Sequence, residues 1–393
     1  MLDRDEAGAS VMNEPQVNAD GRSVRALRID SEPSGMSLQG RLYYLDVLRV
    51  FAIFCVVMIH VCAWHFYQVD IASTRYFAMC LFDEFAHVAV PVFVMISGVL
   101  FLNPAKEVTY DRVFKKYLPR LGVAFAVWSV LYAFYLTAIA TESIQSNGLL
   151  LTYVCNLIRG PLHFWFIPMI AGLYLITPLL RSFTSDANLR KAFLLLGLIF
   201  ALALPSISDL LALSSEPHVV AFASAYNNLV GDFNFQFAVG YSFYFVLGYH
   251  LSTIKVHRPI AFLVVGVLAL AAGTWLVFMQ SGMEGKPNVT LMTNFRVFVF
   301  TGSVGLFAFA KETMQFWSPS AKVAGCVRWL SDRVFGVYLV HLFVIYAFEA
   351  VGLNAVSFNT FLAIPVATLA VFGVSLLLVA AIRAIPRVGK WLT

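Results

Sequence analysis

Charged residues are scarce in this chain of 393 residues: only 12% are Asp, Glu, Lys or Arg, whereas 60% are hydrophobic and the mean hydropathy is +0.78. A soluble globular domain carries about 25% charged and about 45–50% apolar residues. So little charge cannot cover a water-facing surface, which excludes a soluble globular protein and makes lipid the expected solvent. The net charge of +5 does not indicate a nucleic-acid partner, because the basic residues lie between apolar runs and form no single patch.

Cysteine and closely spaced histidine are also scarce. The five cysteines form no CxxC pair, and no two histidines stand in an HxH or HxxxH spacing. Cys55 and Cys62 lie inside an apolar run, where cysteine behaves as a small hydrophobic residue. We therefore expect neither a disulfide framework nor a bound metal ion.

Apolar stretches of about 20 residues recur from Tyr43 onward, and each is long enough to cross a hydrocarbon core of ~30 Å as a helix. Residues 1–41 contain no such stretch; they are polar, and we expect a disordered cytoplasmic tail. Residues 42–393 are expected to form one membrane domain. Its ten predicted spans are 43–66, 84–102, 118–140, 161–180, 192–213, 233–251, 260–279, 292–310, 334–352 and 361–383.

The distribution of basic residues supports this number of spans. Of the 27 lysines and arginines, 22 lie in the tail, in every second loop and after the last span. The other loops hold only Arg75, Arg159 and Lys286, and Arg49 and Arg296 lie inside spans. Because loops rich in Lys and Arg stay in the cytoplasm, we predict an all-α, polytopic membrane protein with about ten transmembrane helices, both termini cytoplasmic, in the inner (plasma) membrane.

Arg49 and His60 are polar residues of the first span, at depths where lipid is expected. Ionisable residues there are costly and face the protein interior. The two are eleven residues apart, which on a helix puts them ~20° apart in azimuth and ~16 Å apart in depth, on one face. Asp46, three residues before Arg49, can pair with it. Alternatively, Arg49 snorkels to the interface and His60 is hydrogen-bonded between helices.

This helix face suits acyl transfer to a hydroxyl group. A base must take the hydroxyl proton as the oxygen attacks a thioester, and imidazole, with a reference pKa of about 6.5, does so at neutral pH. A cation at the cytoplasmic end of the same face could hold the phosphates of an acyl-CoA.

A second polar group is predicted near the depth of His60. The fourth span opens with His163 and Trp165, and the second opens with the pair Asp83-Glu84 followed by His87. Together these residues could line a polar cavity. The alternative is that they are ordinary interface residues, with Trp165 in an aromatic belt.

Three further sites interrupt the apolar spans. The pair Ser97-Gly98 permits close approach of two helices. His341 lies in the middle of the ninth span. Arg296 and Glu349 each lie near the outer end of a span and could form an ion pair with each other.

Five segments in order along residues 41–385 carry a resemblance to a known family. They are YLDVLR at 44–49 followed by His60, VPVFVMISG at 90–98, HFWF at 163–166, YFVLGY at 244–249 and GVYLVH at 336–341. On these segments the chain resembles the acyltransferase-3 family of membrane O-acyltransferases, whose first helix has a basic residue, ten others and a histidine. Many members continue the Ser-Gly pair with Tyr or Phe, whereas this chain has Val99, so no role for that aromatic carries over.

The resemblance implies an acyl-CoA donor, usually acetyl-CoA, and a carbohydrate acceptor in a cell-envelope polymer or its lipid-linked precursor. It implies essential roles for Arg49 and His60 and extends to His163. The candidates for binding acyl-CoA or acceptor are Asp46, Ser97, Trp165 and His341. We therefore expect a membrane O-acetyltransferase similar to single-domain members of the family, in contact with lipid and without metal or nucleic acid.

Two other functions fit parts of the pattern. A secondary transporter of a small polar solute would also use ten helices with intramembrane His and Arg, although no inverted repeat is visible. A polyprenyl-sugar transferase would need acidic metal-binding motifs, for which Asp83-Glu84 is the candidate. Within the acyltransferase hypothesis, direct transfer with His60 as base and a two-step route through an acyl-histidine both stay open.

Overall fold

The computed structural model describes residues 41–233, 236–386 and 389–393. The predicted tail, residues 1–41, lies outside the described residues except for Arg41. Residues Leu42–Thr393 form one compact unit, and every regular element in its described part is a helix.

Eight stretches of the described residues are long and apolar enough to cross a membrane. They are α1 (Tyr43–Phe66); α2 (Thr74–Ala86) with α3 (Ala89–Leu102); α4 (Tyr110–Arg112), η1 (Val113–Tyr117) and α5 (Leu118–Ile139); η2 (Leu162–Trp165) with α8 (Phe166–Thr184); α9 (Ala187–Leu196), η3 (Gly197–Ala203) and α10 (Leu204–Leu211); α13 (Pro259–Glu284); η4 (Thr290–Met292) with α14 (Val297–Met314); and α17 (Thr360–Ala384). A ninth span is formed if α15 (Ala321–Ser331) and α16 (Val334–Ala350), bent by 57°, count as one. The all-α, polytopic membrane fold is confirmed, whereas the cytoplasmic placement of both termini stays a prediction.

The sixth predicted span, 233–251, corresponds to α12 (Gln236–Thr253), which is not among these stretches. Its tyrosines and His250 make it less apolar than the other long helices. Its backbone also departs from helical geometry at Gly240, with φ −26° and ψ −122°. A helix is therefore present where the span was predicted, but it is less apolar than the helices that qualify as membrane spans.

The second span begins ten residues earlier than predicted, at Thr74. Ser73 caps α2, since its hydroxyl accepts a hydrogen bond from the backbone N–H of Tyr76 at 3.2 Å. Asp83 and Glu84 lie inside this helix and are buried. The predicted start of the span, at residue 84, therefore falls inside this helix.

Two predicted outer loops, 141–160 and 214–232, contain helices. The first holds α6 (Thr141–Asn147) and α7 (Leu149–Arg159), and the second holds α11 (Pro217–Asp232). Gly148 and Gly160 bound α7 with positive φ angles of 80° and 62°, which favour glycine. The helix α7 exposes Leu150 and Ile158, as expected of an amphipathic helix at a membrane surface.

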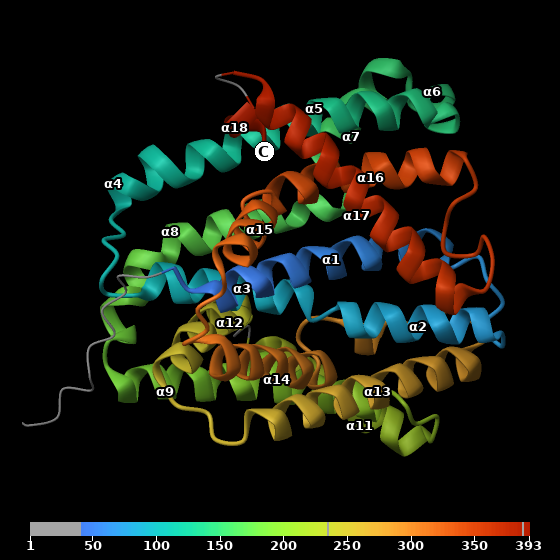
Figure 1. The fold of residues 1–393 in the computed structure, drawn as a ribbon. Helices are drawn as coiled ribbons and strands as arrows, with labels where there is room; N and C mark the ends of the chain where they lie inside the picture. The colour runs from blue at the N-terminus through green and yellow to red at the C-terminus, as the bar shows by residue number, and fades with distance from the viewer. Residues whose placement is uncertain (1–40, 234–235, 387–388) are drawn as a thin grey trace, which may run out of the picture. The chain divides into compact units, whose positions relative to one another are not determined.

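The helix α1 is central in the membrane unit (Figure 1). It contacts α2, α3, α14, α15, α16 and α17. Figure 1 shows α12, α13 and α14 on one side of it and α5, α16 and α17 on the other. Residues of α1 that face inward can therefore meet side chains from several distant parts of the sequence.

Glycines set the contact between α3 and α12. A Cβ atom on Gly98 would lie 1.8 Å from the carbonyl oxygen of Phe245, and one on Gly248 would lie 2.2 Å from that of Met95. Both backbones approach so closely that no side chain fits between them. This confirms the packing role predicted for the Ser97-Gly98 pair. Ser97 itself lines the cavity described next.

Candidate active site

One cavity of about 800 Å³ lies beside α1. Its walls come from α1, α3, η1 and α5, η2 and α8, the start of α16, the end of α17 and the loop before α14. The predicted site residues Arg49, His60, Ser97, His163 and Trp165 all line it. The structure thus brings together residues from the first, second and fourth predicted spans.

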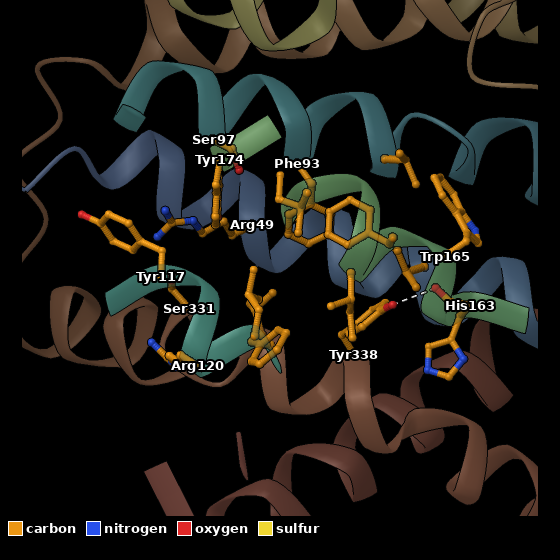
Figure 2. A pocket seen from close by; sticks show the side chains of 18 of the residues that line it. Arg49, Phe93, Ser97, Tyr117, Arg120, His163, Trp165, Tyr174, Ser331 and Tyr338 are labelled. Carbon is orange, nitrogen blue, oxygen red and sulfur yellow. Dashed lines mark hydrogen bonds between the residues drawn. The ribbon is translucent and has the colours of Figure 1, made fainter. Parts of the chain in front are cut away.

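The cavity has a cationic end, lined by Arg49, Lys116, Arg120 and Arg383 and, among the described residues, by a single acidic residue, Asp332. Figure 2 shows Arg49 and Arg120 together with Tyr117 and Ser331, far from His163 and Trp165. The positive charge at this end also affects the nearby loop residue Lys106. Burial lowers the pKa of its ammonium group, and the cations Lys116 and Arg49 lower that pKa further. So many cations around one opening favour a polyanionic ligand.

Asp46 holds Arg49 in place without lining the cavity. The Arg49 guanidinium lies 3.4 Å from Asp46 Oδ1, one helical turn away. The same oxygen accepts a hydrogen bond from the Ser331 hydroxyl at 2.6 Å. Asp46 is buried and so ties α1 to the end of α15 while it orients the arginine. Its predicted contact with substrate remains a prediction.

Histidines form the opposite end of the cavity. His60 comes from α1, His163 from η2 and His87 from the break between α2 and α3. The ring centroids of His60 and His163 are 5.8 Å apart. We call this group, together with Trp165 and Asn294, the histidine end.

The turn before η2 places His163. Gly160 has a positive φ, and Pro161 follows in an extended conformation, so the chain turns sharply before the helix begins. The Tyr338 hydroxyl then donates a hydrogen bond of 2.7 Å to the backbone carbonyl of His163, which joins η2 to α16 (Figure 2). The His163 side chain is buried, and neither ring nitrogen has a hydrogen-bond partner among the described residues.

His341 lies behind this group and does not line the cavity. It is fully buried, with its ring centroid 5.1 Å from that of His60 and 4.9 Å from that of His163. A direct contact with substrate, as expected from the sequence, would require the side chain to move; that role stays a prediction.

The wall between the two ends is mostly apolar. Side chains of Val56, Ile59, Phe93, Ile167 and Ile170 line it. Ser97 is a polar exception, next to Tyr174 in Figure 2. A flexible chain of moderate polarity could lie along this wall.

Two residues that the sequence did not reveal, Tyr241 and Asn294, lie beside Trp165 at the histidine end. Trp165 is 43% exposed, and its ring lies 5.7 Å from that of Tyr241 on α12. Asn294, from the loop before α14, donates its side-chain N–H to the Tyr241 hydroxyl at 2.8 Å. Tyr241 stands three residues before the Tyr244 motif, which is the only sequence signal close to it.

The predicted carboxylates at this level do not reach the cavity. Glu84 is completely buried and faces α13, where a Cβ atom on Gly273 would lie 2.4 Å from Glu84 Oε1. Asp83 lies 3.7 Å from His87 Nδ1, one turn along. Since α2 begins at Thr74, both residues lie within a helix. The Glu84 side chain packs against α13, and that of Asp83 lies beside His87.

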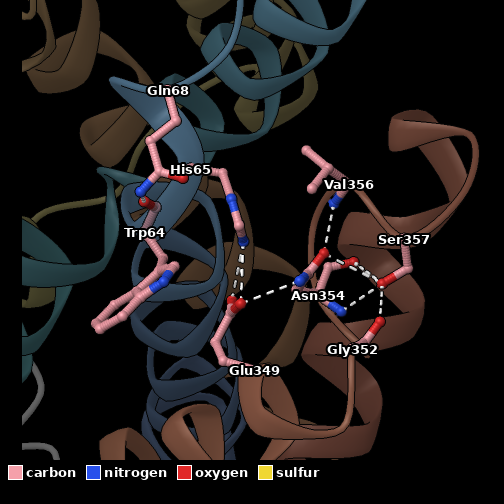
Figure 3. Close-up of polar contacts among 8 residues, drawn as sticks. All are labelled: Trp64, His65, Gln68, Glu349, Gly352, Asn354, Val356 and Ser357. Atoms are coloured by element: carbon pink, nitrogen blue, oxygen red, sulfur yellow. Dashed lines mark hydrogen bonds and ion pairs between the residues drawn. The ribbon is translucent and has the colours of Figure 1, made fainter.

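The suggested pair of Arg296 and Glu349 is wrong. Arg296 forms an ion pair with Asp209 of α10. Glu349 accepts hydrogen bonds from His65 Nε2 at 3.0 Å and from the Asn354 side chain at 3.0 Å (Figure 3). The contact between His65 and Glu349 joins the end of α1 to the end of α16, the two helices that carry His60 and His341.

The cavity therefore separates charge from base. Cations gather at one end, imidazoles at the other, and an apolar wall joins them over the ~16 Å that eleven helical residues span along α1. Among the described residues no group of three His, Cys, Asp or Glu side chains could hold a metal ion. The arrangement suits an elongated substrate with an anionic head and a reactive tail.

Comparison with known proteins places the chain in a family. No curated protein and no solved structure matches it. The model of the acyltransferase domain of the acyltransferase-3 family matches residues 42–380, which include every residue of the cationic end except Arg383 and every residue of the histidine end. The chain belongs to the acyltransferase-3 family of membrane acyltransferases.

Proposed function

We propose that this acyltransferase moves an acetyl or other short acyl group from acyl-CoA to a hydroxyl of a cell-envelope sugar or glycan. The observation that carries the proposal is the cavity itself, which puts cations at one end and imidazoles at the other. Acyl-CoA has the matching order of groups, with phosphates at its head and a thioester at its tail.

The donor would enter at the cationic end. Its phosphates would meet Arg49, Lys116 and Arg120, and its linear pantetheine arm would lie along the apolar wall. If the Lys- and Arg-rich loops are cytoplasmic, this end faces the compartment that contains acyl-CoA. The inner membrane is then the site of the reaction.

The acceptor would approach His60 from the histidine end. There the exposed face of Trp165 can pack against the C–H face of a sugar ring, and Asn294 can hydrogen-bond its hydroxyls. This group is separate from the cationic end, so donor and acceptor would enter the cavity from opposite ends and meet at His60.

In the proposed reaction His60 takes the proton of the acceptor hydroxyl while its oxygen attacks the thioester carbon. A C–O bond forms and the C–S bond breaks. The proton on His60 then passes to the leaving thiolate, so the products are the ester and free CoA. Arg49 does not enter this step; it holds the donor.

Purified protein in proteoliposomes, given radiolabelled acetyl-CoA and lipid-linked glycans extracted from the host membrane, tests the proposal. The acceptor should become labelled, and His60→Ala should lower the rate by about 10²-fold or more. His218→Ala is the matched control, because His218 is exposed on α11 and outside the cavity.

Wild-type transfer by the His60→Ala variant would refute the role of His60 as base. A wild-type protein that labels no acceptor, but exchanges a polar solute across the liposome membrane without consuming acetyl-CoA, would instead be a transporter.

A further inference from the structure

His341 is a buried histidine that the proposed reaction does not use. It is 0% exposed and lies in the middle of α16, among the rings of His60, His163 and Tyr338. A buried polar group normally has a hydrogen-bond partner for each of its polar atoms. One ring nitrogen of His341 does and the other does not.

The backbone of α16 determines the tautomer of His341. Its Nδ1 lies 2.8 Å from the carbonyl oxygen of Tyr338 and 3.1 Å from that of Val337. A carbonyl oxygen only accepts, so Nδ1 carries the hydrogen. A neutral imidazole has one donor and one acceptor nitrogen, and Nε2 of His341 is therefore an acceptor. This atom has no hydrogen-bond partner among the described residues.

The neighbouring hydroxyl groups cannot serve Nε2. The Tyr338 hydroxyl donates to the carbonyl of His163, and the Tyr132 hydroxyl donates to the carbonyl of Leu339. Of the other described rings in contact with His341, those of His60 and His163 carry an N–H that can donate.

The His60 ring centroid lies 5.1 Å from that of His341 and the His163 centroid 4.9 Å, so both rings are close enough for an N–H···N hydrogen bond. We assign the donor to His60 because it is the base of the proposed reaction, and the double variants below distinguish it from His163. Such bonds are often long in a substrate-free enzyme and shorten when the substrate binds.

We propose that His341 is a positioning residue whose Nε2 accepts a hydrogen bond from one ring N–H of His60. Accepting this N–H keeps the other nitrogen of His60 unprotonated and turned toward the cavity, where the acceptor hydroxyl arrives. His341 itself gains and loses no proton. The inference rests on the proposed function, in which His60 is the base.

The test compares His341→Phe with His341→Gln in the proteoliposome assay. Phenylalanine keeps a ring but offers no acceptor, and kcat should fall by about 10²-fold or more, because a base held in the wrong tautomer is a poor base. Glutamine offers a carbonyl oxygen as acceptor, so kcat of His341→Gln should be at least tenfold higher than kcat of His341→Phe. The KM for acetyl-CoA should stay within about twofold of wild type, since the cationic end is remote from His341.

Double variants identify the partner. In a His60→Ala background, His341→Phe should cause no further loss, whereas in a His163→Ala background it should lower the rate again. Ile345→Val, a conservative change at a buried position of the same helix, is the packing control and should retain wild-type kcat. Thermal unfolding in detergent shows whether each variant is folded; if His341→Phe is not, the comparison is made between His341→Leu and His341→Gln.

The inference is overturned if His341→Phe keeps the wild-type kcat, or if His341→Phe and His341→Gln lower kcat equally. It is also overturned if His341→Phe lowers the rate further in the His60→Ala background. None of these results touches the proposed function, which fails only if the wild-type protein does not transfer the acyl group.

Discussion

Arg120 offers the sharpest test of where the donor binds. Its guanidinium lines the cationic end, exposed and 6.0 Å from the ring centroid of Phe335, and no ion pair to it is found among the described residues. Removing its charge as Arg120→Gln should therefore weaken contact with an anionic ligand and leave the packing of α5 intact.

The expected size follows from the exposure of the site. A hydrogen bond to a charged group contributes about 1.5–3 kcal/mol when shielded from water, and exposed ion pairs contribute about 0.2–1 kcal/mol. An exposed arginine at the mouth of a cavity falls between them, near ~1 kcal/mol. Because 1.4 kcal/mol corresponds to tenfold, the KM for acetyl-CoA should rise about fivefold, with kcat little changed.

The assay pairs the variant with a second donor, acetyl-pantetheine, which carries the thioester but no phosphate. Its KM should be high for the wild-type protein and equally high for Arg120→Gln, because the contact that the variant loses is absent in both. Lys322→Gln is the matched control: it removes one exposed charge from α15, outside the cavity, and should change neither KM.

Equal rises in KM for the two donors would refute the placement of the phosphates at the cationic end. An effect of Lys322→Gln as large as that of Arg120→Gln would show that general surface charge, and not a contact in the cavity, attracts the donor.

Three further predictions address the packing and the acceptor. Gly98→Ala should destabilise the protein by ~3 kcal/mol or more, because its Cβ would overlap a carbonyl oxygen of α12, whereas Gly122→Ala, with open space around it, should be neutral or stabilising by about 0.5–1 kcal/mol; thermal unfolding in detergent measures both. A double-mutant cycle of His65→Ala and Glu349→Ala should give a coupling energy of about 1–2 kcal/mol, since the two side chains are only 13% and 15% exposed, and a coupling near zero would contradict the contact in Figure 3. Trp165→Ala should raise the KM for the glycan acceptor by about tenfold and leave that for acetyl-CoA unchanged; the reverse pattern would place the donor at the histidine end.

Hydropathy and the distribution of basic residues predicted most of the fold. The first, fourth and tenth predicted spans agree with α1, with η2 and α8, and with α17 within a few residues at most boundaries. The errors arose where burial in protein overrides composition. Asp83 and Glu84 are sheltered by neighbouring helices, so α2 continues through charges that would have ended it in lipid.

Part of the site could be predicted because it depends on one helix alone. The spacing of Arg49 and His60 determines their common face from helix geometry, and the structure places both in one cavity. Tyr241, Asn294 and Arg383 could not be predicted in the same way. They come from α12, from a loop and from the end of α17, and only the packing of distant elements brings Asn294 and Arg383 into the cavity and Tyr241 against Trp165.

The depth of each residue along the cavity follows from its position in the chain, whereas its contacts with other helices depend on packing. Helices that cross a membrane in succession run in opposite directions, so depth follows position in the chain. Along α1 the cation precedes the histidine. In the second span His87, at the break before α3, precedes Ser97, and along η2 and α8 Trp165 precedes Tyr174, which Figure 2 places near Arg49.

The same reasoning gives the basic residues two roles. Lys116, Arg120 and Arg383 belong to the loops and helix ends whose charge predicts the cytoplasmic side, and they also line the cationic end. A cation that keeps a loop on one side of the membrane is, by its position, available to an anionic ligand on that side. Charge counts in the sequence cannot separate these roles, because both require the same residue at the same depth. The comparison of acetyl-CoA with acetyl-pantetheine separates them, since only the contact with phosphate disappears when the donor loses its charge.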